Sequence, residues 1–297
     1  MTAAEDEATL TAAAFGSEPG TWPLPTAATA RQLWLRAVAA GGQGRFASAR
    51  ADLTALLRDP PIGPLAALAH STQGSFLRQL GWHTLARGWD GQALALAADD
   101  PEAVGDALIG LAADALGAGR FAAAAMLLAR AGAVPETAST APHRLAVRRA
   151  WVTAELAMAT GDGSAAVRQA ERALELTTAP TGEGSVRHRV KSDVVLAGAL
   201  CCVGDIDRAQ AVADAALDTT GRLGLVPLQW ALACLLSDIG SATRTIDEVH
   251  SIRESCAGLV RRRGGSWRFR NQPVRAGDAG QRYPSASEVA PLSEASA

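Results

Sequence analysis

Apolar and small residues recur at helical spacing along most of the chain, and the segment 106–136 shows the pattern most clearly. One helical face carries the first run, at Leu108, Leu111, Ala112 and Ala115. Glycines at 117 and 119 interrupt this run. A second run follows at Phe121, Ala124, Ala125, Leu128 and Ala131, and Pro135 ends it. The segment therefore predicts a helix, a tight turn, a second helix and a stop.

The same turn recurs along the chain as a glycine, an apolar position two residues later, and an alanine three residues after that. The five copies are Gly44, Phe46 and Ala49; Gly81, His83 and Ala86; Gly119, Phe121 and Ala124; Gly161, Gly163 and Ala166; and Gly204, Ile206 and Ala209. His83 and Gly163 are poor choices for the bulky apolar position. Successive turn glycines are 37 to 43 residues apart. The sequence thus predicts a repeated helix-turn-helix unit.

A small residue also recurs inside the first helix of every predicted unit. These residues are Ala37, Gly74, Ala112, Ala154 and Ala197. Two helices cross closely only where one of them lacks a bulky side chain. We therefore expect each of these residues to lie where the two helices of its unit cross.

This pattern resembles the tetratricopeptide repeat, which asks for a small residue at its eighth position, a bulky one at its seventeenth and alanine at its twentieth. In the segment 106–136 these are Ala112, Phe121 and Ala124, and Pro135 stands near the end. No copy has the full pattern, and the spacing exceeds the ideal of about 34 residues, so extra residues are expected between units. The resemblance implies an all-α fold, a tetratricopeptide-like right-handed α-solenoid of five to six helix pairs.

The resemblance also implies a binding groove on the concave side, lined by fixed positions of each first helix. Carried onto this sequence, these positions predict a peptide-binding groove that carries four cations and two tryptophans. The residues are Arg31, Trp34, Ser71, Ser75, Arg78, Asp106, Arg148, Trp151, Glu155 and Lys191, together with the apolar Ile109, Met158 and Val194. A second interpretation is that the charges are a solvated face and the tryptophans pack between repeats.

Both ends of the chain break the helical pattern. Residues 1–25 are acidic and then contain alanine and proline, which predicts a disordered tail, with Trp22 expected to dock on the repeats. The helical-repeat domain is expected over 26–263. Residues 264–297 are rich in Gly, Ser, Pro and Arg, which predicts a second disordered tail.

The start of this C-terminal tail is a second candidate site. The segment 261–282 has seven arginines against one acidic residue, with aromatic residues between them. Such a segment has the groups needed for phosphate contact and base stacking. The candidate residues are Arg261, Arg262, Arg263, Trp267, Arg268, Phe269 and Arg270.

The composition favours helix and gives little sign of catalysis. The chain is 48% hydrophobic but only 4% aromatic, with a net charge of −2, so bulk charge does not favour nucleic acid. Familiar catalytic and metal-ligand motifs are missing, and the four cysteines have no ligand spacing. We therefore predict no enzyme activity, no cofactor and no metal. Neither a signal peptide nor a membrane span is expected, so the predicted location is cytoplasmic.

Three functional hypotheses follow. The first is a protein- or peptide-binding adaptor or scaffold that uses the concave face, with another protein or a peptide as its partner. The second is a ligand-sensing regulatory protein of a signalling or transcription system. The third is nucleic-acid association through the arginine-rich tail. The oligomeric state and the identity of the partner do not follow from the sequence.

Overall fold

The computed structural model of the chain describes residues 3–58, 63–135, 143–178 and 184–268, and these contain thirteen helices and no strand. The helices are α1 (Ala3–Phe15), α2 (Ala30–Gly42), α3 (Phe46–Arg58), α4 (Pro64–Gln79), α5 (His83–Leu96), α6 (Pro101–Gly117), α7 (Phe121–Gly132), α8 (Arg144–Ala159), α9 (Gly163–Thr177), α10 (Val186–Cys202), α11 (Ile206–Leu223), α12 (Val226–Ile239) and α13 (Ile246–Arg262). The prediction of an all-helical chain is confirmed for this part.

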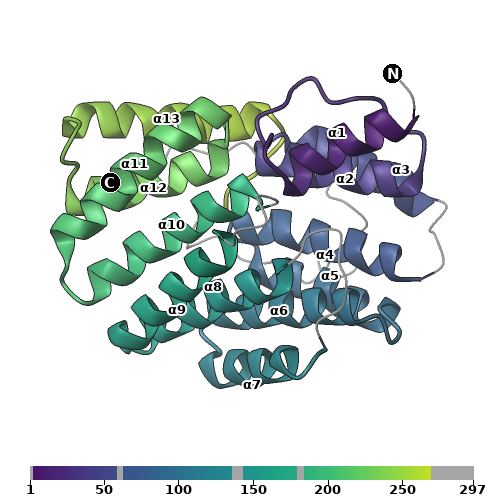
Figure 1. Cartoon of the computed structure of the whole chain (residues 1–297), viewed down its shortest axis with the longest axis horizontal. Helices are drawn as coiled ribbons and strands as arrows, with labels where there is room; N and C mark the ends of the chain where they lie inside the picture. Colours follow the sequence, from purple (N-terminus) through teal and green to yellow (C-terminus); the bar gives the residue numbers. More distant parts are fainter. Residues whose placement is uncertain (1–2, 59–62, 136–142, 179–183, 269–297) are drawn as a thin grey trace.

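After α1, the helices form six consecutive pairs, and the two helices of each pair pack against each other. The first helix of each pair also contacts the first helix of the next pair, in the order α2, α4, α6, α8, α10, α12. We call these six helices the inner layer. Figure 1 shows the pairs following one another from α2–α3, through α6–α7 and α8–α9, to α12–α13.

The turn inside each of the first five pairs has the same backbone geometry. The five predicted turn glycines all have positive φ, between 71° at Gly44 and 88° at Gly81. In each turn, the amide after the glycine donates a hydrogen bond to the carbonyl five residues before it, as Arg120 does to Ala115. A side chain strains this left-handed conformation, which explains glycine at this position.

The small residues predicted at the helix crossings are buried in each of the first five pairs. Ala37, Ala112, Ala154 and Ala197 are fully buried and Gly74 is buried as well. The alanines that follow the turns, at 49, 86, 124, 166 and 209, are also fully buried. The local sequence pattern therefore predicts which small residues are buried within each of the first five pairs.

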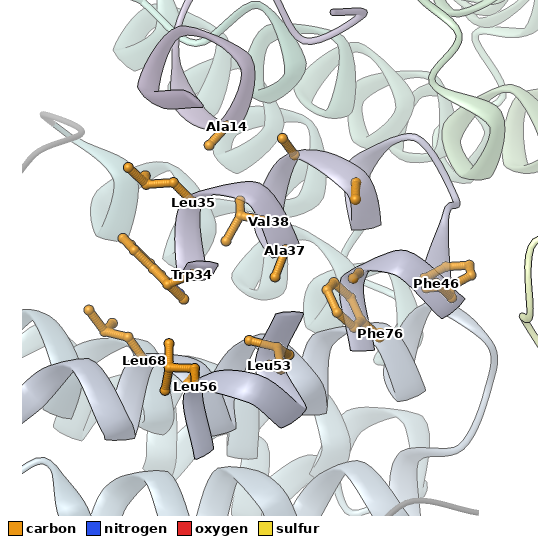
Figure 2. Close-up of a cluster of buried hydrophobic side chains, with 14 of the residues drawn as sticks. Ala14, Trp34, Leu35, Ala37, Val38, Phe46, Leu53, Leu56, Leu68 and Phe76 are labelled. Atoms are coloured by element: carbon orange, nitrogen blue, oxygen red, sulfur yellow. The ribbon is translucent and has the colours of Figure 1, made fainter. Parts of the chain in front are cut away.

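The two ends of the helical array meet in one hydrophobic core. This core joins α1–α4 to α12, α13 and the segment after them, and it contains Trp34, Phe46, Phe76, Val260 and Trp267. Figure 2 shows the N-terminal part of this core, with Trp34 above Leu56 and Leu68, and Phe46 near Phe76. The Phe46 and Phe76 rings meet edge to face at 5.7 Å.

The structure differs from the expected tails at both ends. Residues 3–15 form α1, and α1 packs on α2 and α10, where the sequence predicted disorder. Residues 264–268 pack against the first two helix pairs, because Arg268 N donates to Leu80 O at 2.9 Å and Trp82 Nε1 donates to Ser266 O at 2.7 Å. The rest of the predicted C-terminal tail, 269–297, lies outside the described residues.

Candidate functional site

The predicted groove residues all lie on helices of the inner layer, but most of them are bonded to neighbouring helices. Four of the ten are buried, namely Trp34, Ser71, Asp106 and Trp151, and the other six are half-buried. The two tryptophans show this directly. Trp34 Nε1 on α2 donates to Thr72 Oγ1 on α4 at 3.0 Å, and Trp151 Nε1 on α8 donates to Ser192 Oγ on α10 at 2.8 Å. In both cases a tryptophan on the first helix of one pair bonds to the first helix of the next pair. These indoles therefore hold neighbouring pairs together.

Arg78 is bonded in the same way, by two carboxylates from the neighbouring helices α5 and α6. Its Nη2 lies 2.5 Å from Asp90 Oδ2, and its Nε lies 3.3 Å from Asp114 Oδ1. Both carboxylates are fully buried. The Asp90 carboxylate fits because two glycines face it: a Cβ added at Gly74 or Gly110 would lie within 3 Å of it. The small residue at position 74 therefore makes room for a charged group.

Burial governs the protonation of this cluster. It raises the pKa of Asp90 to about 7, although the Arg78 charge opposes the shift, and the nearby Asp114 adds to it. Arg78 is shared between two carboxylates, so its single charge does not neutralise both. Around neutral pH we expect a proton to be shared within this group.

A second charged group joins α6 to α8. Arg144 Nη1 lies 2.9 Å from Asp106 Oδ1, and Arg144 Nη2 lies 3.2 Å from Glu102 Oε1. Arg148 contacts the same Asp106 carboxylate. The charges of Arg144 and Arg148 are thus balanced by the carboxylates of Asp106 and Glu102. Two of the predicted groove residues, Asp106 and Arg148, are therefore already ion-paired.

The remaining predicted groove residues form weaker contacts. Lys191 Nζ lies 3.0 Å from Glu155 Oε1, and Arg31 Nε lies 3.0 Å from Glu7 Oε1 on α1. Ser71 is buried, and its hydroxyl has no hydrogen-bond partner among the described residues. Ser75 is half-buried.

Helix α1 packs against the inner layer. It buries Leu10, Ala13, Ala14 and Phe15. The Phe15 ring centroid lies 5.4 Å from that of Trp34 on α2 and 6.3 Å from that of His188 on α10. The guanidinium of Arg144 on α8 lies 5.7 Å from the Phe15 centroid. One phenylalanine therefore contacts three helices of the layer that was predicted to bind a peptide.

The C-terminal end of α1 meets two groups that sequence reasoning missed, Arg187 and His188. Arg187 Nη2 donates to Ala14 O at 3.2 Å, and Val186 N donates to Gly16 O at 3.1 Å. Burial lowers the pKa of Arg187 to about 10, and the Arg144 charge adds to this. Burial and the charges of Arg187, Arg144 and Arg148 hold the pKa of His188 well below its ordinary value.

A simple sequence signal exists for two of the missed arginines. Arg144 and Arg187 each precede a predicted groove cation, Arg148 or Lys191, by four residues. This spacing puts both members of each pair on the same helical face. The role of His188 has no such signal, because it depends on the contact with α1.

Trp22 docks on the first helix pair, as expected, whereas the C-terminal candidate site differs from expectation. Trp22 stacks on Arg45, whose guanidinium carbon lies 3.7 Å from the ring centroid, while 43% of the residue is exposed. Trp267 is buried against Trp230 and so is not exposed for base stacking. Arg261 and Arg262 are exposed, Arg263 donates to Gln43 O, and Arg268 lies 6.0 Å from the Trp82 centroid. Phe269 and Arg270 lie outside the described residues.

No family model matches this chain, and no curated protein sequence matches it significantly. Within the described ranges, no helix has both the length and the apolar character of a membrane span. In the same ranges, no three His, Cys, Asp or Glu side chains are grouped so that they could hold a metal ion.

Proposed function

We propose that this chain is a cytoplasmic adaptor or scaffold whose six helix pairs form a tetratricopeptide-like right-handed solenoid, and that its inner layer binds a helical segment of a partner protein. The repeated glycine turns and the buried alanines at equivalent positions support the repeat assignment. The docking of α1 on α2, α8 and α10 carries the proposal for the site, because it shows what kind of segment this surface accommodates.

The α1 contacts indicate how such a partner segment would be held. Leu10, Ala13 and Ala14 stand at helical spacing of three and four residues, and Phe15 completes the apolar face. Glu7 lies one turn before Leu10 on the same side of α1, and it pairs with Arg31 at 3.0 Å. An amphipathic helix that combines an acidic residue with leucine and an aromatic residue would reproduce these contacts.

The predicted groove is therefore not an open channel lined by free charges. Arg78, Asp106, Arg148 and the two tryptophans connect neighbouring pairs and set the shape of the inner layer. The surface that contacts a helix includes Trp34, His188, Arg144 and Arg187. We assign partner binding to this surface and a structural role to most of the predicted groove residues. The ligand-sensing and nucleic-acid hypotheses stay predictions.

A peptide-rebinding experiment tests the proposal. A full-length Phe15→Ala chain holds α1 more weakly, because a buried phenylalanine contributes about 3–5 kcal/mol. A fluorescent synthetic peptide of residues 3–16 should then bind the variant saturably and the wild-type chain much more weakly. A peptide that itself carries Phe15→Ala is the matched control. Equal binding of the two peptides, or no binding of either, would refute this assignment.

A further inference from the structure

The C-terminal end of α1 lies in a corner of the inner layer where positive charge exceeds negative charge. Three arginines meet there, Arg144 and Arg148 from α8 and Arg187 from α10. The carboxylates that pair with them are Glu102 and Asp106, and both are bonded to the α8 arginines. Among the described residues, no carboxylate lies within ion-pair distance of Arg187.

The arginines of this corner also have unused hydrogen-bond donors. The side chain of Arg144 is 7% exposed, and its Nε is buried without a partner among the described residues. Arg187 Nε is also buried and has no hydrogen-bond partner among the described residues. A buried guanidinium without an anionic partner is unfavourable, because desolvation is not offset by an ion pair. The lowered pKa of Arg187 has this cause.

The acceptors that now reach this corner are backbone carbonyls of α1 and of the residue after it. Ala14 O accepts from Arg187, and Gly16 O accepts from Val186 N, in the first turn of α10. Carbonyls at a helix C-terminus carry only a partial negative charge, of about half an electron for the whole helix end. A full negative charge at the same place would fit the three arginines and the N-terminus of α10 better.

We propose that Arg144, Arg148 and Arg187 form an anion-recognition site, at which a partner helix that displaces α1 places a carboxylate or phosphate group. The proposal rests on the proposed function, since α1 and the partner helix compete for the same surface. Arg187 is the specificity-determining residue, because it alone of the three lacks a carboxylate partner. Helix α1 then covers the site without placing a negative charge beside the three arginines. An anionic partner helix therefore displaces α1 more readily than a neutral one.

Two pairs of peptides test this, each against the full-length Phe15→Ala chain by fluorescence anisotropy. The first pair is residues 3–16 with a free C-terminal carboxylate or with an amide. The second pair is amidated residues 3–17 with Ser17 free or phosphorylated, which supplies the anion from a side chain. We expect the anionic member of at least one pair to bind about tenfold more tightly or better, as charge-assisted hydrogen bonds require.

Adding Arg187→Gln to this chain should remove the preference. Arg172→Gln should keep it, because Arg172 is exposed on α9 and pairs with Glu175. Circular dichroism checks the fold of each variant. Should Arg187→Gln unfold the chain, Arg187→Lys replaces it, and a preference that is undiminished in this variant counts against the site. Equal affinities within both pairs would overturn the anion site while leaving the proposed function intact. Absence of binding by every peptide would overturn both.

Discussion

The indole ring of Trp267 lies against that of Trp230, with ring centroids 4.2 Å apart and planes inclined by 33°. Trp230 belongs to α12, and Trp267 lies in the segment after α13. The neighbouring Ser266 carbonyl accepts a hydrogen bond from Trp82, in the turn between the two helices of the second pair. The segment 263–268 therefore ties the last helix pair to the first two.

Trp267→Ala should consequently destabilise both ends of the array. Removing a buried tryptophan costs about 3–5 kcal/mol of unfolding free energy. Urea denaturation followed by far-ultraviolet circular dichroism measures this loss. Trp22→Ala is the matched control, because Trp22 is 43% exposed, and its effect should be well under half as large. If the two variants lose similar stability, the C-terminal segment does not close the array.

The hydrogen bond from Trp34 to Thr72 predicts that a ring without an N–H at position 34 destabilises the fold. Trp34→Phe keeps an aromatic ring beside Phe15 but removes the indole N–H. Thr72 Oγ1 still donates to Leu68 O, so it keeps one bond. We expect a loss of about 1–3 kcal/mol from the missing hydrogen bond and the smaller ring.

The double-mutant cycle of Trp34→Phe with Thr72→Val isolates the hydrogen bond, and its coupling energy should be about 1 kcal/mol. The equivalent cycle of Trp151→Phe with Ser192→Ala should give a similar value, because Trp151 Nε1 and Ser192 Oγ are 2.8 Å apart. A coupling energy near zero in both cycles would contradict the role of these indoles as ties between pairs.

Phe15→Ala should release α1 while the helix pairs stay folded. Phe15 contacts α2, α8 and α10, whereas the pairs are held by contacts that do not include it. Amide hydrogen exchange followed by mass spectrometry should therefore show loss of protection in residues 3–15 and little change in α5, α7 or α9. The control is Thr9→Ala, which removes a hydroxyl that donates to Glu5 O within α1. Loss of protection throughout the chain would mean that α1 is an integral part of the fold.

Local sequence patterns predicted the helix pairs well because the features that define them are local. Turn glycines such as Gly119 and crossing residues such as Ala112 act within about twenty residues of each other. The docking of α1 was missed because the surface that Phe15 contacts is formed by α2, α8 and α10, and residues 1–25 carry no pattern that predicts this contact. Arg187 was missed for the same reason, since its unpaired state depends on where α1 and α8 lie.

The predicted groove residues lie on the first helices of the pairs, and the groove prediction did not foresee how they pair. Arg78 on α4 and Asp106 on α6 both pair with side chains of neighbouring helices. Their partners come from sites that no repeat pattern marks, Asp90 on α5 and Arg144 on α8. Charge pairing between helices depends on side chains far apart in sequence, and the spacing within one helix cannot reveal it.

The buried Asp90 carboxylate predicts that stability falls as pH rises from about 4 to about 7. Burial, with the help of Asp114, raises the pKa of Asp90 to about 7, whereas an aspartate in an unfolded chain has a pKa of about 3.9. Between these values the folded protein binds more protons than the unfolded chain. The contribution of Asp90 to the free energy of unfolding therefore falls with rising pH, by at most about 1.4 kcal/mol per unit.

Asp90→Asn tests this, because an amide imitates the protonated acid: its oxygen accepts from Arg78 and its N–H₂ can donate toward Asp114. Relative to wild type, the variant should gain stability as pH rises from about 5 to about 8, when the free energy of unfolding is measured by urea denaturation at each pH. Asp218→Asn, an exposed aspartate on α11, is the matched control and should run parallel to wild type. Parallel curves for Asp90→Asn and wild type would show that Asp90 is ionised throughout this range, and that Arg78 neutralises it in spite of the second carboxylate.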